Sequence, residues 1–145
     1  MRTRDQMAAA EGLAFKEGWH IRWSPAIDSP NHSKYAVAGA AVLVKIGYGL
    51  FDLPNLPCDV YTGFVAAGLV ELFAGLPFMA YSTYLECGLG LAGRNCDIMK
   101  AIGAHLKGHG LLFVIGGDFN VPPQEMSESI WPASFGGVID AIYGR

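Results

Sequence analysis

Hydrophobic and polar positions alternate along the chain in blocks that predict both helices and strands. The segment from Arg4 to Glu17 is rich in Ala, Glu, Gln and Lys, with apolar residues at helical spacing. We expect an amphipathic helix there, ending at Gly18. A second helix is expected from Arg94 to Lys107, followed by glycines that favour its termination. Its apolar stripe consists of Ile98, Ile102 and Leu106.

Five shorter apolar runs predict strands. Trp19 to Trp23 is rich in aromatic residues, as a short strand would be, and Val37 to Val44 fits a strand covered on both faces. Two runs, Phe64 to Phe73 and Phe78 to Leu85, are separated by Gly-Leu-Pro, which favours a turn. Leu111 to Ile115 is expected to be a buried strand that stops at two glycines.

Polar and glycine-rich stretches predict the connections. Asp28 to Lys34 is expected to be a polar loop, and Lys45 to Asp59, with two glycines and two prolines, is expected to be turn and loop. The resulting order of one helix, several strands, a second helix and a last strand indicates an α/β fold rather than a helical bundle.

A membrane helix is the alternative for one part of this pattern. Val60 to Tyr81 is almost wholly apolar and long enough to span a bilayer. Glu71 lies within it, and a central acid costs about 2.5–3.5 kcal/mol on an insertion scale. Three glycines also interrupt the stretch. Two buried strands joined by a turn explain the same residues better, so we expect no membrane segment.

Composition and charge narrow the classes of function. The 145 residues are 52% hydrophobic and 16% charged, with a formal net charge of −3, so no general basic field attracts nucleic acid. Cys58, Cys87 and Cys96 are odd in number and lack C-x-x-C spacing, which indicates neither a disulfide framework nor a zinc ribbon. The N-terminal residues show no apolar signal-peptide core, so an intracellular location is favoured.

The strongest chemical signal is the run Leu-Leu-Phe-Val-Ile-Gly-Gly-Asp-Phe-Asn, residues 111–120. A hydrophobic strand delivers Asp118 and Asn120 to its carboxyl end, and period-two alternation places both side chains on one face. A carboxylate beside an amide can hold a hard cation or a water molecule next to a phosphate oxygen. The structural alternative is an Asx turn that caps the strand. Spacing alone leaves both interpretations open.

Gly-Asp-Phe-Asn after an apolar strand resembles the signature of the endonuclease/exonuclease/phosphatase superfamily. The run Ala-Tyr-Ser-Thr-Tyr-Leu, residues 80–85, resembles the family strand that ends in a catalytic tyrosine or histidine. Arg94 matches the arginine that often opens the following helix, and residues 38–44 resemble an early family strand. The likeness extends over about residues 35–125 of a single domain, residues 1–145, and implies a fragment of a four-layer α/β sandwich.

The resemblance also implies roles for individual residues. Asp118 and Asn120 would bind the metal and orient water and the scissile phosphate, and Tyr84 would stabilise charge in the transition state. Arg94 would contact the substrate. One or two Mg²⁺ ions, or Mn²⁺, would neutralise the phosphate of a nucleic acid or another phosphodiester. The implied activity is metal-dependent phosphodiester hydrolysis.

Parts of the family pattern do not occur in the chain. The strand with the family's asparagine and the metal-binding glutamate would precede the helix at Arg4 to Glu17, and no histidine follows Asn120 to match the terminal Asp-His pair. We therefore expect an incomplete domain with little or no activity by itself, and a non-catalytic remnant of the fold is an alternative.

Two other patterns suggest different sites. Gly88, Gly90 and Gly93 form a G-x-G-x-x-G between a strand and a helix, so a dinucleotide-binding half-domain is the second alternative. We expect this loop to be an ordinary surface connection, because the motif is weak alone. His105 and His109 have the spacing of metal ligands on a helix, but Gly108 favours two surface histidines at a helix end.

Overall fold

The structure is a computed structural model that describes residues 4–29, 32–53, 62–72, 75–129 and 131–137. Its secondary structure is mixed α/β. In chain order the elements are α1 (Arg4–Lys16), β1 (Trp19–Ser24), β2 (Ile27–Ser29), β3 (His32–Val37), β4 (Ala40–Lys45), β5 (Gly49–Phe51), β6 (Val65–Glu71), β7 (Phe78–Tyr84), α3 (Gly93–His109), β8 (Leu112–Asp118), α4 (Pro123–Glu128) and the short 3₁₀ helix η1 (Ala133–Phe135).

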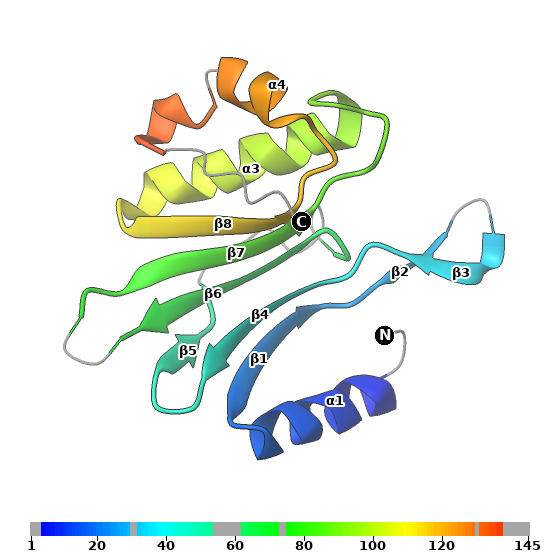
Figure 1. Ribbon diagram of the computed structural model, residues 1–145, viewed down its shortest axis with the longest axis vertical. Helices are drawn as coiled ribbons and strands as arrows, with labels where there is room; N and C mark the ends of the chain where they lie inside the picture. The colour runs from blue at the N-terminus through cyan, green and yellow to red at the C-terminus, as the bar shows by residue number, and fades with distance from the viewer. Residues whose placement is uncertain (1–3, 30–31, 54–61, 73–74, 130, 138–145) are drawn as a thin grey trace.

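The strands form one larger sheet and two antiparallel pairs. The larger sheet has the order β5-β6-β7-β8, in which β5, β6 and β7 pair antiparallel and β8 pairs parallel to β7. The helix α3 makes the crossover between the two parallel strands and covers one face of the sheet (Figure 1). The pairs are β1 with β4 and β2 with β3. The pair β1–β4 lies between β6 and α1, which packs against β1 (Figure 1).

The hydrophobic core lies between α3 and the larger sheet. The helix presents a buried stripe that includes Ile98, Ile102 and Leu106, and β7 contributes Met79 and Tyr81 on the facing side. Burying an aliphatic side chain of this size stabilises the fold by about 1.5–3 kcal/mol. By contrast, the hydrophobic residues of β1 and β4 include a single buried one, Val42. Most of the burial therefore belongs to the part of the chain that carries the Gly-Asp-Phe-Asn motif.

Several sequence predictions are confirmed. The N-terminal helix ends at Lys16, next to a positive φ at Gly18, and the first strand occupies the expected residues. The runs around Phe64 to Phe73 and Phe78 to Leu85 form the antiparallel neighbours β6 and β7. Within the described ranges, none of the helices has the length and apolar character that crossing a bilayer requires.

Two predictions in the N-terminal half are wrong. The expected polar loop from Asp28 to Lys34 contains parts of β2 and β3, because pairing through the backbone does not require apolar side chains. The expected single strand from Val37 to Val44 is broken at Ala38 and Gly39, whose φ angles are 61° and 103°. Positive φ is incompatible with an extended strand, so β3 and β4 are separate strands.

Two further corrections concern apolar runs. The segment Lys45 to Asp59, expected to be turn and loop, contains the short strand β5, and its residues 54–59 lie outside the described residues. The strand β8 was expected to be buried, but its residues Leu112 and Val114 are 67% and 58% exposed. It occupies one end of the strand order, where only β7 pairs with it among the described strands. The exposed Leu112 and Val114 alternate with Phe113 and Ile115, which pack against the core, so the strand is covered on one face only.

Candidate active site

The candidate residues Tyr84 and Asp118 lie at the ends of two hydrogen-bonded parallel strands. They are direct partners in the register of β7 and β8, and the N–H of Leu85 donates to the carbonyl of Asp118 at 2.9 Å. Neighbouring strands lie about 4.8 Å apart, and partners in register project from the same face. The buried residues Met79, Tyr81 and Thr83 face α3, so Tyr84 and Asp118 belong to the opposite face.

Asn120 joins this pair through a turn rather than through strand alternation. The strand ends at Asp118, and Asn120 has a left-handed φ of 48°. Its backbone N–H donates to Oδ1 of Asp118 at 3.2 Å, and its Nδ2 donates to the carbonyl of Leu85 at 2.7 Å. The first of these bonds is an Asx turn, which was the structural alternative for the motif. The second ties the amide to the end of β7, so both acid and amide are held at one point.

The glycine before Asp118 allows β7 and β8 to approach. Gly117 has φ +147°, and a Cβ at this position would lie 1.9 Å from the carbonyl oxygen of Thr83. A side chain there is excluded by the backbone of the neighbouring strand. Gly116 differs, since a Cβ at that residue would meet nothing within 4 Å. Of these two glycines, only Gly117 is therefore required by the geometry of the strand end.

An aromatic residue that sequence reasoning missed connects Tyr84 with Arg94. The ring centroids of Phe64 and Tyr84 are 6.4 Å apart, and the Arg94 guanidinium carbon lies 5.0 Å from the Phe64 ring centre. Phe64 is buried, and its carbonyl accepts hydrogen bonds from the N–H of Tyr84 and the hydroxyl of Thr83. Its place just before β6 gave no local signal, because the contacts join residues far apart in the sequence.

Arg94 is engaged by an acid that the sequence analysis also missed. Its Nη1 donates to Oε1 of Glu86 at 3.0 Å, and the side chains are 52% and 35% exposed. An exposed pair of this kind contributes about 0.2–1 kcal/mol. Such a bond is weak enough for a phosphate to compete with Glu86 for the guanidinium. The predicted substrate contact of Arg94 remains a prediction.

The glycine-rich connection between β7 and α3 is fixed by a buried asparagine. Asn95 is 0% exposed, and its Oδ1 accepts the N–H of Glu86 at 2.8 Å. Its Nδ2 donates to the carbonyls of Glu86 and Gly90 at 2.9 and 2.8 Å. The left-handed glycines of this connection are Gly88, Gly90 and Gly93. These glycines therefore serve a tight turn stapled by Asn95, with Arg94 at the start of α3 as expected.

The donors at the strand end suit a hard cation. Asp118 is exposed and offers carboxylate oxygens, and Mg²⁺ is usually held by one or two carboxylates together with water and substrate phosphate. The residues that the structure describes contain no cluster of three or more His, Cys, Asp or Glu able to enclose an ion. The described residues therefore do not enclose a cation completely. They fit a site in which one carboxylate, that of Asp118, shares the cation with water and the substrate phosphate.

The histidines of α3 differ from the expectation of two surface side chains. The helix continues through Gly108 to His109, and the two imidazole rings have centroids 4.6 Å apart. His105 is 7% exposed, and its Nδ1 lies 2.5 Å from the hydroxyl of Tyr81. Tyr81 is itself part of the core, so His105 is a buried polar partner of that core rather than a surface group.

Comparison with known proteins adds no relative to these observations. The chain matched no known family, no curated protein and no solved structure. A function must therefore be inferred from the arrangement of the chain's own residues.

Proposed function

We propose that the chain contributes part of the catalytic site of a metal-dependent phosphodiesterase of the type that the endonuclease/exonuclease/phosphatase resemblance implies. The observation that carries this proposal is the pairing of Tyr84 with Asp118 at adjacent strand ends, with Asn120 hydrogen-bonded to Asp118 and to Leu85, the residue that follows β7. Two residues that are 34 positions apart in the sequence thereby meet at the carboxyl ends of neighbouring parallel strands. This end of the sheet is the usual position of ligand sites in α/β folds.

The chemistry assigned to each residue follows from its atoms. The Asp118 carboxylate would bind Mg²⁺ or Mn²⁺ and orient its water, while the amide of Asn120 is held beside it. Tyr84, on the same face, would donate its phenolic hydroxyl to an oxygen of the pentavalent phosphorus. The metal, when bound, would supply Lewis acidity and a water molecule of lowered pKa.

The arrangement of elements is compatible with the four-layer sandwich proposed for the parent fold. From one end to the other, Figure 1 shows α3, the larger sheet, the β1–β4 pair and α1. Helices therefore lie outside and strands inside, with β4 packed near β6 and β7. This order of layers supports the proposed four-layer sandwich.

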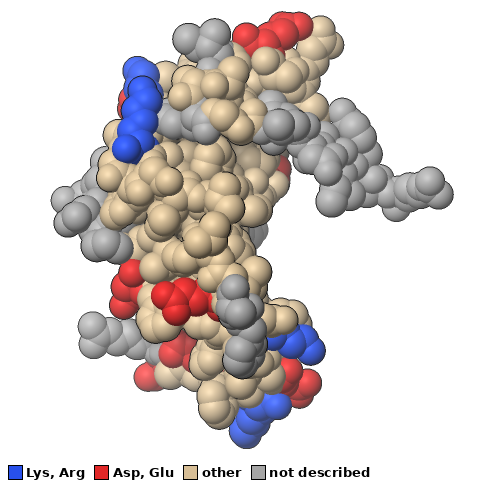
Figure 2. Space-filling view, turned by 90° about the vertical axis from the view of Figure 1, so that its left-hand side faces the viewer, with Lys and Arg blue, Asp and Glu red and all other residues tan. Residues whose placement is uncertain are grey.

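Substrate binding would rely on the metal and the site rather than on a general positive field. The net charge is −3, and Figure 2 shows basic side chains in separate groups near the two ends of the viewed side, with acidic groups between and beside them. The proposed substrate class is a nucleic acid or another phosphodiester. Asp118 would hold the Mg²⁺ that neutralises the charge of the phosphate, which makes binding dependent on the cation.

A binding assay with matched variants tests this proposal. A fluorescent single-stranded oligonucleotide is titrated with the full chain in Mg²⁺ or EDTA at fixed ionic strength, and its anisotropy is measured. We expect Mg²⁺ to tighten binding about tenfold, or about 1.4 kcal/mol, and Asp118→Ala to abolish this difference. Asp97→Ala, which removes an exposed acid from α3, is the control and should preserve it.

Turnover is expected to be low, because this chain has no match for the family's metal-binding glutamate and terminal histidine. Catalytic groups that act as a unit lose most of their effect when one of them is missing. A generic aryl phosphodiester and the oligonucleotide serve as substrates for this measurement. Binding that is independent of Mg²⁺, or a Mg²⁺ effect that survives Asp118→Ala, would overturn the assignment of Asp118.

A further inference from the structure

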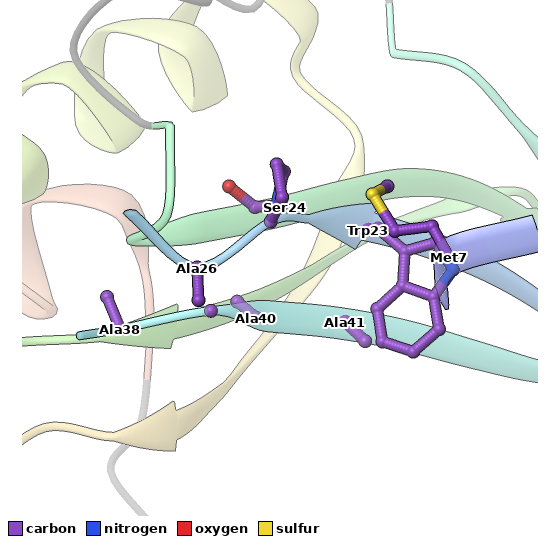
Figure 3. Close-up of a pocket in the computed structure, with 9 residues that line it drawn as sticks. Met7, Trp23, Ser24, Ala26, Ala38, Ala40 and Ala41 are labelled. Carbon is purple, nitrogen blue, oxygen red and sulfur yellow. The ribbon is translucent and has the colours of Figure 1, made fainter. Parts of the chain in front are cut away.

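The side chains of the candidate site lie at an open strand end. Asp118 is exposed and Asn120 is half-buried. Neither lines the cavity of about 220 Å³ that lies where α1 approaches β1 and β4, in which Figure 3 shows Met7 and Trp23 near one end and Ala38 near the other. Because both side chains reach the surface, their direction depends on hydrogen bonds more than on packing.

One peptide group joins the candidate site to the first turn of α3. This peptide links Leu85 to Glu86, directly after the end of β7. Its carbonyl, which belongs to Leu85, accepts a hydrogen bond from Nδ2 of Asn120 at 2.7 Å. Its N–H, which belongs to Glu86, donates to Oδ1 of Asn95 at 2.8 Å. Asparagine side chains from two different segments therefore hold the two polar groups of the same peptide.

Asn95 is the fixed member of this arrangement. It is 0% exposed, and its Nδ2 donates to the carbonyls of Glu86 and Gly90 at 2.9 and 2.8 Å. Both ends of its amide are therefore hydrogen-bonded. It also lies in the first turn of α3, the helix whose buried stripe packs against the sheet. The position of the Asn95 side chain is thus set by the hydrophobic core and is passed to the backbone of Glu86.

The same peptide determines the direction of the Asn120 amide. An amide is planar, so the bond from Nδ2 to the Leu85 carbonyl also fixes the direction of Oδ1. Oδ1 is the atom of Asn120 that can accept a hydrogen bond from a cation-bound water. The N–H of Leu85 donates to the carbonyl of Asp118 at 2.9 Å, so the backbone of the acid is tied to the same point. Hydrogen bonds that form such a series strengthen one another.

We propose that Asn95 is a positioning residue of the cation site, and that it acts on Asn120 through the peptide between Leu85 and Glu86. The inference rests on the proposed function and deepens it, because it names the residue that orients the polar groups of the same site. Asn95 is fully buried and cannot contact a substrate, so its effect passes through this peptide. A residue that only fixed the glycine-rich connection would leave Asn120 unaffected.

Hydrogen exchange in the metal-free chain tests this connection without any assay of activity. Asn120→Gly removes the bond to the Leu85 carbonyl, and glycine accepts the left-handed φ of 48° at this position. We expect the N–H of Glu86, on the other side of the same peptide, to exchange about five times faster, as measured by NMR. The N–H of Leu91 belongs to the same connection but donates to Glu125 at 3.3 Å, so its exchange should stay within about twofold. Unchanged exchange of Glu86, or equal acceleration of Glu86 and Leu91, would overturn the inference.

Variants of Asn95 test the effect on the cation site with the anisotropy assay described above. Asn95→Leu has a side chain of similar size without hydrogen-bonding atoms, whereas Asn95→Asp keeps an oxygen that can accept the N–H of Glu86. We expect Asn95→Leu to reduce the tenfold effect of Mg²⁺ to about twofold, with the affinity in EDTA unchanged within about twofold. Asn95→Asp should retain more of the Mg²⁺ effect than Asn95→Leu. Adding Asn120→Gly to Asn95→Leu should cause no further loss, because both substitutions break the same connection.

Glu125→Ala is the matched control, because it removes the other side-chain bond to the same connection and should preserve the Mg²⁺ effect. A Mg²⁺ effect that survives Asn95→Leu, or an equal loss of affinity in Mg²⁺ and in EDTA, would overturn the inference alone. Absence of a Mg²⁺ effect in the original chain would instead overturn the proposed function. The hydrogen-exchange result needs no Asn95 variant, so it decides whether the two asparagines are connected even if Asn95→Leu does not fold.

Discussion

The two faces of the parallel strands β7 and β8 have opposite environments. On the face toward α3, Met79 is 0% exposed and Tyr81 is 3% exposed. On the other face, Leu112 is 67% exposed and Val114 is 58% exposed, although β8 is as apolar in sequence as β7. The difference shows that position in the sheet, rather than apolar content, decides what these strands bury.

The residues that stabilise the fold and the residues of the candidate site lie on different faces of these strands. The covered face contains the core that holds α3 on the sheet, whereas the other face, which is half-buried on β7 and exposed on β8, ends in Tyr84 and Asp118. A face that is not filled by core packing leaves polar groups at the strand ends accessible to a substrate. The candidate site thus lies where burial stops, and changes on the two faces should have different consequences.

The largest effect is expected at the contact between the two strands. Gly117→Ala would place a Cβ 1.9 Å from the Thr83 carbonyl oxygen at a φ of +147°. Because a backbone atom cannot rotate away, we expect a loss of more than about 4 kcal/mol in the free energy of unfolding, or failure to fold. Urea denaturation followed by circular dichroism measures the change. Gly116→Ala meets nothing within 4 Å and should stay within about 1 kcal/mol of the original chain. Equal effects of both substitutions would refute the close strand contact.

A smaller difference is expected between core and open-face truncations. Met79→Ala removes a fully buried side chain and should lower the free energy of unfolding by about 3 kcal/mol. Val114→Ala removes a side chain that is 58% exposed and should change it by less than about 0.5 kcal/mol. Both values come from the same urea titrations. A Val114→Ala cost close to that of Met79→Ala would mean that the open face is covered in solution.

Local patterns were sufficient to predict much of this fold. The helical spacing of Ile98, Ile102 and Leu106 depends on one segment only, and so does the turn between β6 and β7. The exposure of β8 depends instead on which strands lie beside it, which no single segment encodes. The hairpin β2–β3 was missed for a related reason, since its polar side chains conceal a pairing made by the backbone.

The candidate site could be predicted in part. Asp118 and Asn120 were named because a strand end followed by acid and amide is a recognisable local pattern, and Tyr84 because residues 80–85 resemble a strand of the superfamily. The structure brings the three together at one strand end. Phe64 was missed because its contact with Arg94 arises only when distant segments meet. Glu86 is only eight residues from Arg94, but their ion pair depends on how the glycine-rich connection turns back toward α3. Tertiary contact therefore marks the limit of what the local pattern predicts.

The most direct test of the central claim is a map of where a divalent cation binds on the chain. Mn²⁺ is added in small increments to isotope-labelled protein, and the paramagnetic broadening of each backbone amide signal is measured. We expect the strongest broadening at Leu85, Asp118 and Asn120, its loss in Asp118→Asn, and its retention in the control Asp97→Asn. Broadening centred on His105 and His109, or broadening at the strand end that persists in Asp118→Asn, would contradict the central claim.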